Sequence, residues 1–119
     1  MSPEKARVFI AEDNKNFLDI IQEYLEEAGH SVVLKASTLT DALAGVNNLE
    51  KLGIDVAVLD GNLDEWETKG YDGQEVLRAI HATAPRVRTI GMSGNKFPNA
   101  DIDLGKDKVE EIGKIVTKL

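Results

Sequence analysis

Two short apolar runs, each followed by acidic residues, constrain the fold of this chain more than any other feature. Val8 to Ala11 precede Glu12 and Asp13, and Val56 to Leu59 precede Asp60. Neither run alternates with polar residues, which is typical of strands buried on both faces of a parallel sheet. A carboxylate at the end of a buried strand is costly unless it is paired or bound. The two runs therefore predict a shared acidic pocket, suited to a divalent cation and to a carboxylate nucleophile.

Further short apolar runs alternate with amphipathic stretches along the rest of the chain. We expect strands at 7–11, 31–36, 55–59 and 86–92, and a short fifth strand within 101–104. We expect helices at 15–27, 38–53, 73–83 and 107–118, with Phe17, Ile20, Ile21, Tyr24, Leu25 and Ala28 on the apolar face of the first. This alternation predicts an α/β protein, a doubly wound parallel sheet of five strands in the order 2-1-3-4-5 with helices on both faces.

Chain length and net charge argue against several classes of protein function. The chain has 119 residues, which suits one domain spanning 1–119. Its net charge of -7 argues against nucleic-acid binding and against an anionic membrane surface. No apolar stretch is long enough for a signal peptide or a membrane span, and cysteine is absent. We therefore expect a cytoplasmic protein without disulfides.

The chemistry is expected beyond the carboxyl ends of the strands, where doubly wound sheets bind their ligands. Glu12 and Asp13 follow the first strand, Asp60 the third, Ser93 the fourth and Lys106 the fifth. Each alone has an ordinary structural explanation: the first two acids as helix caps, Asp60 and Ser93 as turn residues, and Lys106 as a solvated side chain. The combination is more specific, because three carboxylates, a hydroxyl and an ammonium converge on one edge.

This combination suits phosphoryl transfer. Close carboxylates repel and need a compensating charge, and Mg²⁺ or Mn²⁺ bound by oxygen ligands would supply it. An aspartate beside the ion can attack a phosphoryl group and form an aspartyl phosphate. Lys106 would pair with Asp60 and then with a phosphoryl oxygen, and Ser93 would bind another oxygen. Asn62 would offer its backbone carbonyl to the metal.

Over almost its whole length the chain resembles the CheY-like receiver domain of two-component response regulators. The strongest stretches are 8–14, 56–60 and 72–77, with weaker support at 92–94 and 100–106. The resemblance implies that Asp60 is the phosphoacceptor, that Asp13 binds Mg²⁺ directly and that Glu12 binds it through water. It further implies that Ser93 supplies the switch hydroxyl and that Lys106 corresponds to the invariant lysine of the family. It also implies a flavodoxin-like fold and a histidine kinase or phosphotransfer protein as phosphodonor.

Three features depart from the family pattern. The segment from Asp64 to Tyr71, which contains Trp66, lengthens the loop after Asp60 and replaces a usual proline. It is either a tolerated surface insertion or a lid or partner contact beside Asp60. Only twelve residues separate Ser93 from Lys106, so the helix that usually lies between the fourth and fifth strands is predicted to be missing or reduced.

The third departure concerns signal output. Asp103 stands where the family has its switch aromatic, and Asp107 stands where a proline usually follows the lysine. We therefore expect output by an uncommon route, from a monomer or from a dimer through a non-standard face. Trp66 and Phe97 either touch the mouth of the site or pack locally.

Two readings of the function remain open. The first is a phosphoaccepting receiver, not an enzyme acting on a separate substrate, whose open Gly94 side admits water and speeds hydrolysis. The second is a pseudo-receiver, which binds a partner protein independently of phosphorylation. A flavin carrier is excluded because Glu12 and Asp13 would repel its phosphate, and a haloacid-type phosphatase because the candidate nucleophile follows the third strand. His30 and His81 are expected to be surface or helix-end residues.

Overall fold

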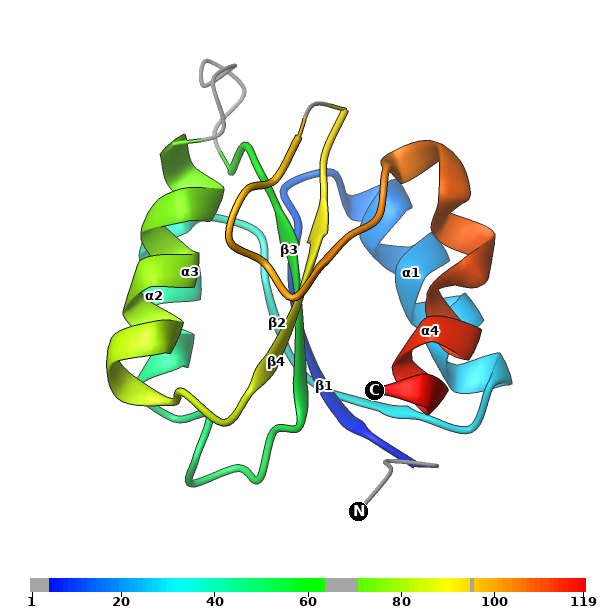
Figure 1. Ribbon diagram of the computed structural model, residues 1–119, viewed down its shortest axis with the longest axis horizontal. Helices are drawn as coiled ribbons and strands as arrows, with labels where there is room; N and C mark the ends of the chain where they lie inside the picture. Colours follow the sequence, from blue (N-terminus) through cyan, green and yellow to red (C-terminus); the bar gives the residue numbers. More distant parts are fainter. Residues whose placement is uncertain (1–4, 64–70, 95) are drawn as a thin grey trace.

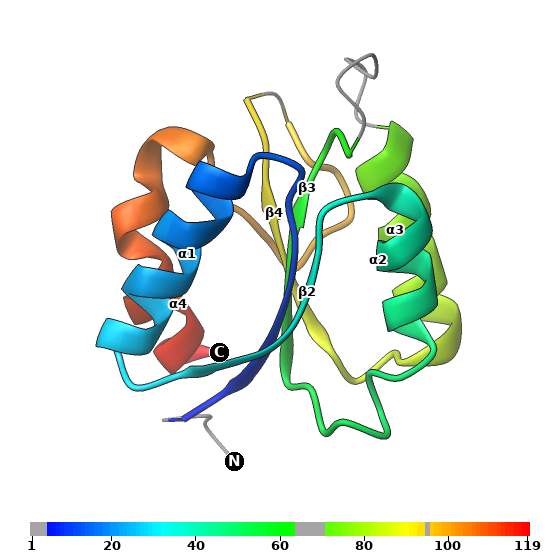
Figure 2. The same ribbon diagram turned by 180° about the vertical axis from the view of Figure 1, so that it is seen from behind.

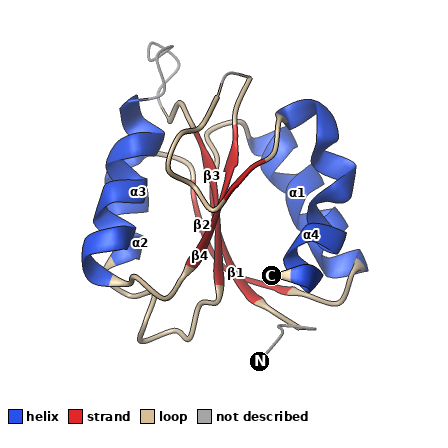
Figure 3. Cartoon of the chain, viewed as in Figure 1, coloured by secondary structure: helices blue, strands red, loops and turns tan. Residues whose placement is uncertain are grey.

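The computed structural model describes residues 5–63, 71–94 and 96–119. Its strands form one parallel sheet in the order β2-β1-β3-β4-β5 (Figure 3). The strands are β1 (Arg7–Ala11), β2 (Ser31–Ala36), β3 (Val56–Asp60), β4 (Arg88–Met92) and β5 (Ile102–Asp103). The predicted strand order is confirmed.

Helices cover both faces of this sheet, as predicted. They are α1 (Lys15–Glu27), α2 (Leu39–Val46), α3 (Tyr71–Thr83), the 3₁₀ helix η1 (Lys106–Glu111) and α4 (Ile112–Lys118). Helices α2 and α3 pack on one face, and α1 with α4 on the other (Figures 1 and 2). Because every crossover returns the chain to the same end of the sheet, all strands point their carboxyl ends to one edge.

Each face of the sheet has its own apolar core, and β1 contributes to both. Phe9 and Ala11 belong to the core under α2 and α3, whereas Val8 and Ile10 belong to the core under α1 and α4. All four side chains are buried, which explains why the strand reads as a continuous apolar run.

Helix α1 begins and ends where the sequence predicts. The Asn14 side chain accepts a hydrogen bond of 3.0 Å from the Phe17 N–H and so caps the helix. The predicted buried face is partly wrong, because Leu18 is buried while Ile20 is exposed. Ile20 therefore lies at the edge of the apolar stripe.

Other boundaries differ from the predictions by a few residues. Helix α2 ends at Val46 rather than at Gly53, and turns fill the interval. Helix α3 begins at Tyr71, two residues before the predicted start. The expected helix at 107–118 is divided into the 3₁₀ helix η1, which ends at Glu111, and α4, which begins at Ile112, and the non-helical backbone of Lys108 (φ -113°, ψ 24°) kinks η1 itself.

The link between β4 and β5 contains no helix among its described residues, 93–94 and 96–101. Phe97 fills this place instead: its side chain is buried in the core that α2 and α3 share. Its N–H donates to Asp103 Oδ2 at 3.0 Å, and Gln74 on α3 donates to the Pro98 carbonyl at 2.9 Å. A single aromatic side chain on a short, anchored loop thus covers this part of the sheet.

The prediction for His30 is confirmed in part: its backbone N–H donates to Leu25 O at 3.0 Å at the end of α1, but its side chain is buried beneath α4 rather than at the surface. Its Nδ1 accepts a hydrogen bond from the Ala6 N–H at 2.9 Å, so its Nε2 carries the proton and faces Gly113 O at 3.2 Å and Thr117 Oγ1 at 3.0 Å. The imidazole therefore joins Ala6, the residue before β1, to α4, whereas His81 is exposed on α3 as expected.

Two further expectations, on the insertion at 64–71 and on membrane spans, can be compared only with the described residues. The proposed insertion at 64–71 lies outside them, apart from Tyr71, and so does Trp66. Within them, no helix combines the length and the apolar character that crossing a membrane requires.

Candidate functional site

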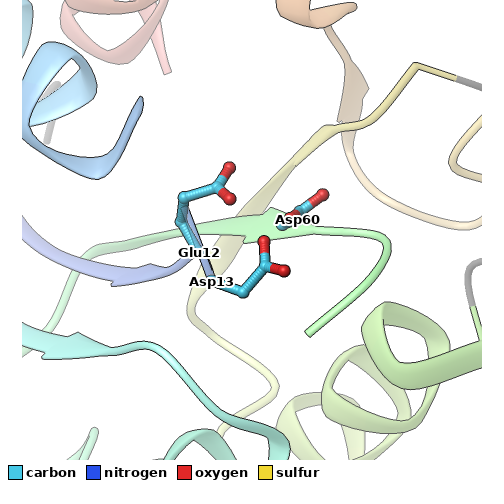
Figure 4. A group of neighbouring side chains, drawn as sticks. All are labelled: Glu12, Asp13 and Asp60. Atoms are coloured by element: carbon cyan, nitrogen blue, oxygen red, sulfur yellow. The ribbon is translucent and has the colours of Figure 1, made fainter. Parts of the chain in front are cut away.

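Three carboxylates meet at the carboxyl edge of the sheet, as the strand order predicts. Glu12 and Asp13 follow β1, and Asp60 is the last residue of β3. These strands are parallel neighbours, and Ala11 pairs with Leu59, so Glu12 and Asp60 stand at the same level. Figure 4 shows the three side chains directed into one space, and one oxygen of each lies within 4.8 Å of the others.

Two of these acids are almost completely removed from solvent. Glu12 is 1% exposed and Asp60 is 3% exposed, whereas Asp13 is half-buried. Glu12 Oε2 accepts the Asn14 N–H at 3.0 Å, but Glu12 Oε1 has no hydrogen-bond partner among the described residues. A buried acceptor without a donor costs free energy, so this oxygen is suited to a cation or to a proton.

Lys106 supplies the positive charge closest to the acids. Its Nζ lies 3.2 Å from Asp60 Oδ1 and 3.5 Å from Glu12 Oε1, the latter an ion-pair contact rather than a hydrogen bond. Lys106 begins η1 three residues after the end of β5, so the lysine lies at the carboxyl edge of the sheet. The side chain is 35% exposed. One ammonium thus faces three carboxylates, which leaves room for further positive charge.

The crowded acids alter each other's protonation. Burial, together with hydrogen bonding to Asp60, raises the pKa of Glu12 to about 9. Burial also raises the pKa of Asp60. For Lys106, burial opposes the charged form, but the carboxylates of Asp60 and Glu12 outweigh it and raise the pKa of the ammonium. Without a metal, the pair of buried carboxyls therefore retains a proton near neutral pH.

Ser93 and Asn62 lie at the same edge. Ser93 follows β4, is buried, and lines a cavity of about 610 Å³ together with Lys106. Asn62 follows Asp60 by two residues and is half-buried. The structure thus brings five of the residues singled out in the sequence, namely Glu12, Asp13, Asp60, Ser93 and Lys106, to one place.

The larger of the two cavities described here lies away from the three acids. A cavity of about 730 Å³ lies at the opposite edge of the sheet, where Gly53 and Ile54 precede β3 and where Arg86 and Val87 precede β4. It contains none of the buried carboxylates. We place the site at the carboxyl edge, because the costly buried charges are there.

Sequence reasoning missed two residues that contact this site. The backbone N–H of Asn14 binds Glu12, and the ring of Phe17 lies beneath the Lys106 ammonium, 5.1 Å from Nζ to the ring centroid. A signal existed, since the first turn of the helix after β1 must begin at the edge where Glu12 lies.

The donor set fits a hard divalent cation. Carboxylates and backbone carbonyls are the ligands that Mg²⁺ and Mn²⁺ prefer, and the clustered oxygens include one acid oxygen that lacks a hydrogen bond. A bound cation would displace the proton that the crowded acids otherwise retain.

Comparisons with known proteins agree with this geometry. The sequence model of the response regulator receiver domain matches residues 8–110. Among solved structures, the chain is similar to the signal receiver domain of the putative response regulator NarL from Mycobacterium tuberculosis, with 27% identity and a TM-score of 0.74. That match covers 96% of this chain and 94% of the other.

Two further structures share the fold at lower identity. A CheY-like receiver domain protein from Methanospirillum hungatei is 24% identical, with a TM-score of 0.71 and coverage of 94% of both chains. The response regulator RcsB of Salmonella typhimurium is 23% identical, with a TM-score of 0.73 over 93% of this chain. This chain spans 57% of the RcsB chain. No curated protein matches the sequence.

The family match covers most of the chain, and the fold and strand order agree with those of its structural neighbours. The acidic residues gathered at the carboxyl edge lie within the matched segment. The chain therefore belongs to the response regulator receiver domain family.

Proposed function

We propose that this chain is a phosphoaccepting receiver in a two-component phosphorelay, with Asp60 as the phosphoacceptor. The observation that carries the proposal is the buried Asp60 carboxylate, grouped with Glu12 and Asp13 and lying 3.2 Å from the Lys106 ammonium. A buried carboxylate beside a cation site and an ammonium can attack a phosphoryl group whose charge both neighbours offset.

The proposed donor is a phosphohistidine of a histidine kinase or phosphotransfer protein. An Asp60 oxygen attacks the phosphorus, the phosphorus–nitrogen bond breaks, and the imidazole of the donor keeps the electron pair. Lys106 moves its attraction from Asp60 Oδ1 to a phosphoryl oxygen, and the Ser93 hydroxyl donates to another. In this transfer the protein contributes positioning and charge compensation.

The proposed metal ligands are Asp13, Asp60 and the backbone carbonyl of Asn62, with Glu12 acting through a water molecule. Mg²⁺ or Mn²⁺ bound there would neutralise the phosphoryl charge. We expect no turnover of a separate substrate. We also expect rapid loss of the phosphoryl group to water, since Gly94 is exposed and has no heavy atom within 4 Å of where a Cβ would stand.

A second candidate is a pseudo-receiver that binds a partner protein without phosphorylation. The described residues between β4 and β5 form no helix, and the exposed Asp103 accepts the Phe97 N–H where the family usually has an aromatic ring. This observation concerns the output surface rather than the acids. We therefore favour a working receiver with an uncommon output route.

Intact-mass spectrometry after incubation with acetyl phosphate separates the two candidates. We expect one phosphoryl adduct that requires Mg²⁺ and is lost in Asp60→Asn. The matched control is Asp55→Asn, immediately before the same strand, where an amide oxygen can still accept the Arg7 N–H as Asp55 Oδ2 does at 2.9 Å. No adduct on the folded wild-type protein would favour the pseudo-receiver.

A further inference from the structure

The ammonium of Lys106 has a neutral neighbour besides the two carboxylates. Its Nζ lies 5.1 Å from the centroid of the Phe17 ring, within the range of a cation–π interaction. Phe17 stands in the first turn of α1, and Lys106 begins η1, so the contact joins two elements far apart in sequence.

The ring is held more firmly than the lysine. The Phe17 N–H binds the cap Asn14 at 3.0 Å, and the half-buried ring packs against the apolar core under α1 and α4. Lys106, in contrast, has a flexible four-carbon stem and is 35% exposed. The Phe17 ring therefore has a fixed position on one side of the Lys106 ammonium, whose stem is flexible.

A divalent cation changes the balance of forces on Lys106. At present the ammonium is attracted by Asp60 at 3.2 Å and Glu12 at 3.5 Å. A cation bound to these acids offsets their charge and repels the ammonium. The attraction of an aromatic ring involves no formal charge that the cation could neutralise, so it persists.

We propose that Phe17 is a positioning residue for Lys106, which keeps the ammonium over the site once the carboxylates hold a cation. The inference rests on the proposed function, because it deepens the role of Lys106 in phosphoryl transfer. It assigns to Phe17 an effect on the rate of transfer that apolar packing alone would not produce.

Three variants separate the ring's electrostatic role from its packing. Phe17→Leu keeps an apolar side chain but removes the π face, and Phe17→Trp restores a stronger one. Tyr24→Leu is the matched control: it removes the other half-buried aromatic of α1, seven residues further along, which packs on the same core. Thermal unfolding should show that all three variants are folded.

The first readout is the proton NMR spectrum of the Lys106 side chain, with and without Mg²⁺. We expect an upfield ring-current shift of the Hε protons in wild type, retained when Mg²⁺ is added, lost in Phe17→Leu and unchanged in Tyr24→Leu. Hε protons without a ring-current shift in Mg²⁺-loaded wild type would overturn the proposal. This readout stands even if the wild-type protein forms no phosphoryl adduct.

The second readout is the rate of Mg²⁺-dependent adduct formation with acetyl phosphate. We expect Phe17→Leu to be slower by about two- to fivefold, the range that a partly exposed cation–π contact supports, while Phe17→Trp and Tyr24→Leu match wild type. Equal slowing in Phe17→Leu and Tyr24→Leu, or no slowing in Phe17→Leu, would overturn the proposal. Absence of the adduct in wild type would instead refute the proposed function.

Discussion

Replacing Gly91 by alanine should destabilise this protein because Phe97 occupies the space that a side chain would need. A Cβ at residue 91 would overlap Cβ and Cγ of Phe97 and would lie 2.7 Å from its Cδ1. Gly91 lies within β4 and is buried, so the strand has little freedom to move away. The ring, which covers the sheet where no helix does, must therefore shift.

The free-energy cost of Gly91→Ala comes from overpacking and from the burial that the Phe97 ring loses. Overpacking a well-packed core costs about 1–3 kcal/mol, and full burial of a phenylalanine side chain is worth about 1.5–3 kcal/mol. We therefore expect Gly91→Ala to lower the free energy of unfolding by about 2 kcal/mol. Gly94→Ala is the matched control, since its Cβ would meet no heavy atom within 4 Å. It should be neutral or slightly stabilising, because alanine restricts the unfolded chain.

The assay is urea unfolding followed by circular dichroism on Gly91→Ala, Phe97→Gly and the double variant. Replacing Phe97 by glycine removes Cβ, Cγ and Cδ1, the three atoms that the new Cβ would meet, so the added methyl group should cost little in that background. We expect a coupling free energy of at least about 1 kcal/mol between the two positions. Strictly additive costs would refute the conclusion that the Phe97 ring lies on Gly91.

Three further predictions concern the site and its supports. Without Mg²⁺, the free energy of unfolding should fall as pH rises from about 5 to 9, by at most about 1.4 kcal/mol per pH unit. The reason is that Glu12 in the folded protein (pKa about 9) retains a proton that the same carboxyl in the unfolded chain (pKa 4.5) releases. Saturating Mg²⁺ should abolish this decline in denaturant titrations, and a flat metal-free profile would contradict the pKa. His30→Ala should cost about 2 kcal/mol in thermal unfolding, since the buried imidazole joins Ala6 to α4, whereas the exposed His81→Ala should cost almost nothing; equal effects would be inconsistent with this role. Gly73→Ala should impair Mg²⁺ binding measured by calorimetry, because its Cβ would lie 2.6 Å from the Asp60 carbonyl oxygen, and wild-type affinity would argue against that contact.

The parts of the fold that could be predicted are those set by local sequence. The bounds of β1, β2 and α1 are as predicted, because each apolar pattern ends at a clear signal such as the Asn14 cap. The absence of a helix among the described residues between β4 and β5 also follows from local sequence, since the short interval between Ser93 and Lys106 has no room for one. Strand order then brings the acids of β1 and β3 together without further information.

The parts that could not be predicted depend on contacts between distant residues. Phe97 reads as a loop aromatic, and only the folded chain shows that Gly91 on β4 and Gly73 on α3 leave space for its ring. His30 reads as a helix-end residue, yet its side chain bonds Ala6, just before β1, and Gly113 on α4. The buried Leu18 and exposed Ile20 show that the helical period leaves the edge of a buried face undetermined.

The functional site, like the fold, could be predicted only in part. The types and positions of its acids could be predicted from the strand ends, but their protonation could not, because the pKa of Glu12 depends on the burial of its side chain and on its contact with Asp60. The sequence predicts the Phe17 ring only as part of the apolar face of α1, although the ring also contacts the Lys106 ammonium. Helical periodicity indicates which face a side chain occupies, not which charge approaches it.

The central claim is that Asp60 itself carries the phosphoryl group. The most direct measurement is borohydride reduction of the Mg²⁺- and acetyl phosphate-treated protein, followed by peptide mass spectrometry, since reduction converts an aspartyl phosphate into homoserine. The account predicts homoserine at residue 60 in wild type and at no residue in Asp60→Asn. Homoserine at residue 13 or at another aspartate, with Asp60 unmodified, would contradict it.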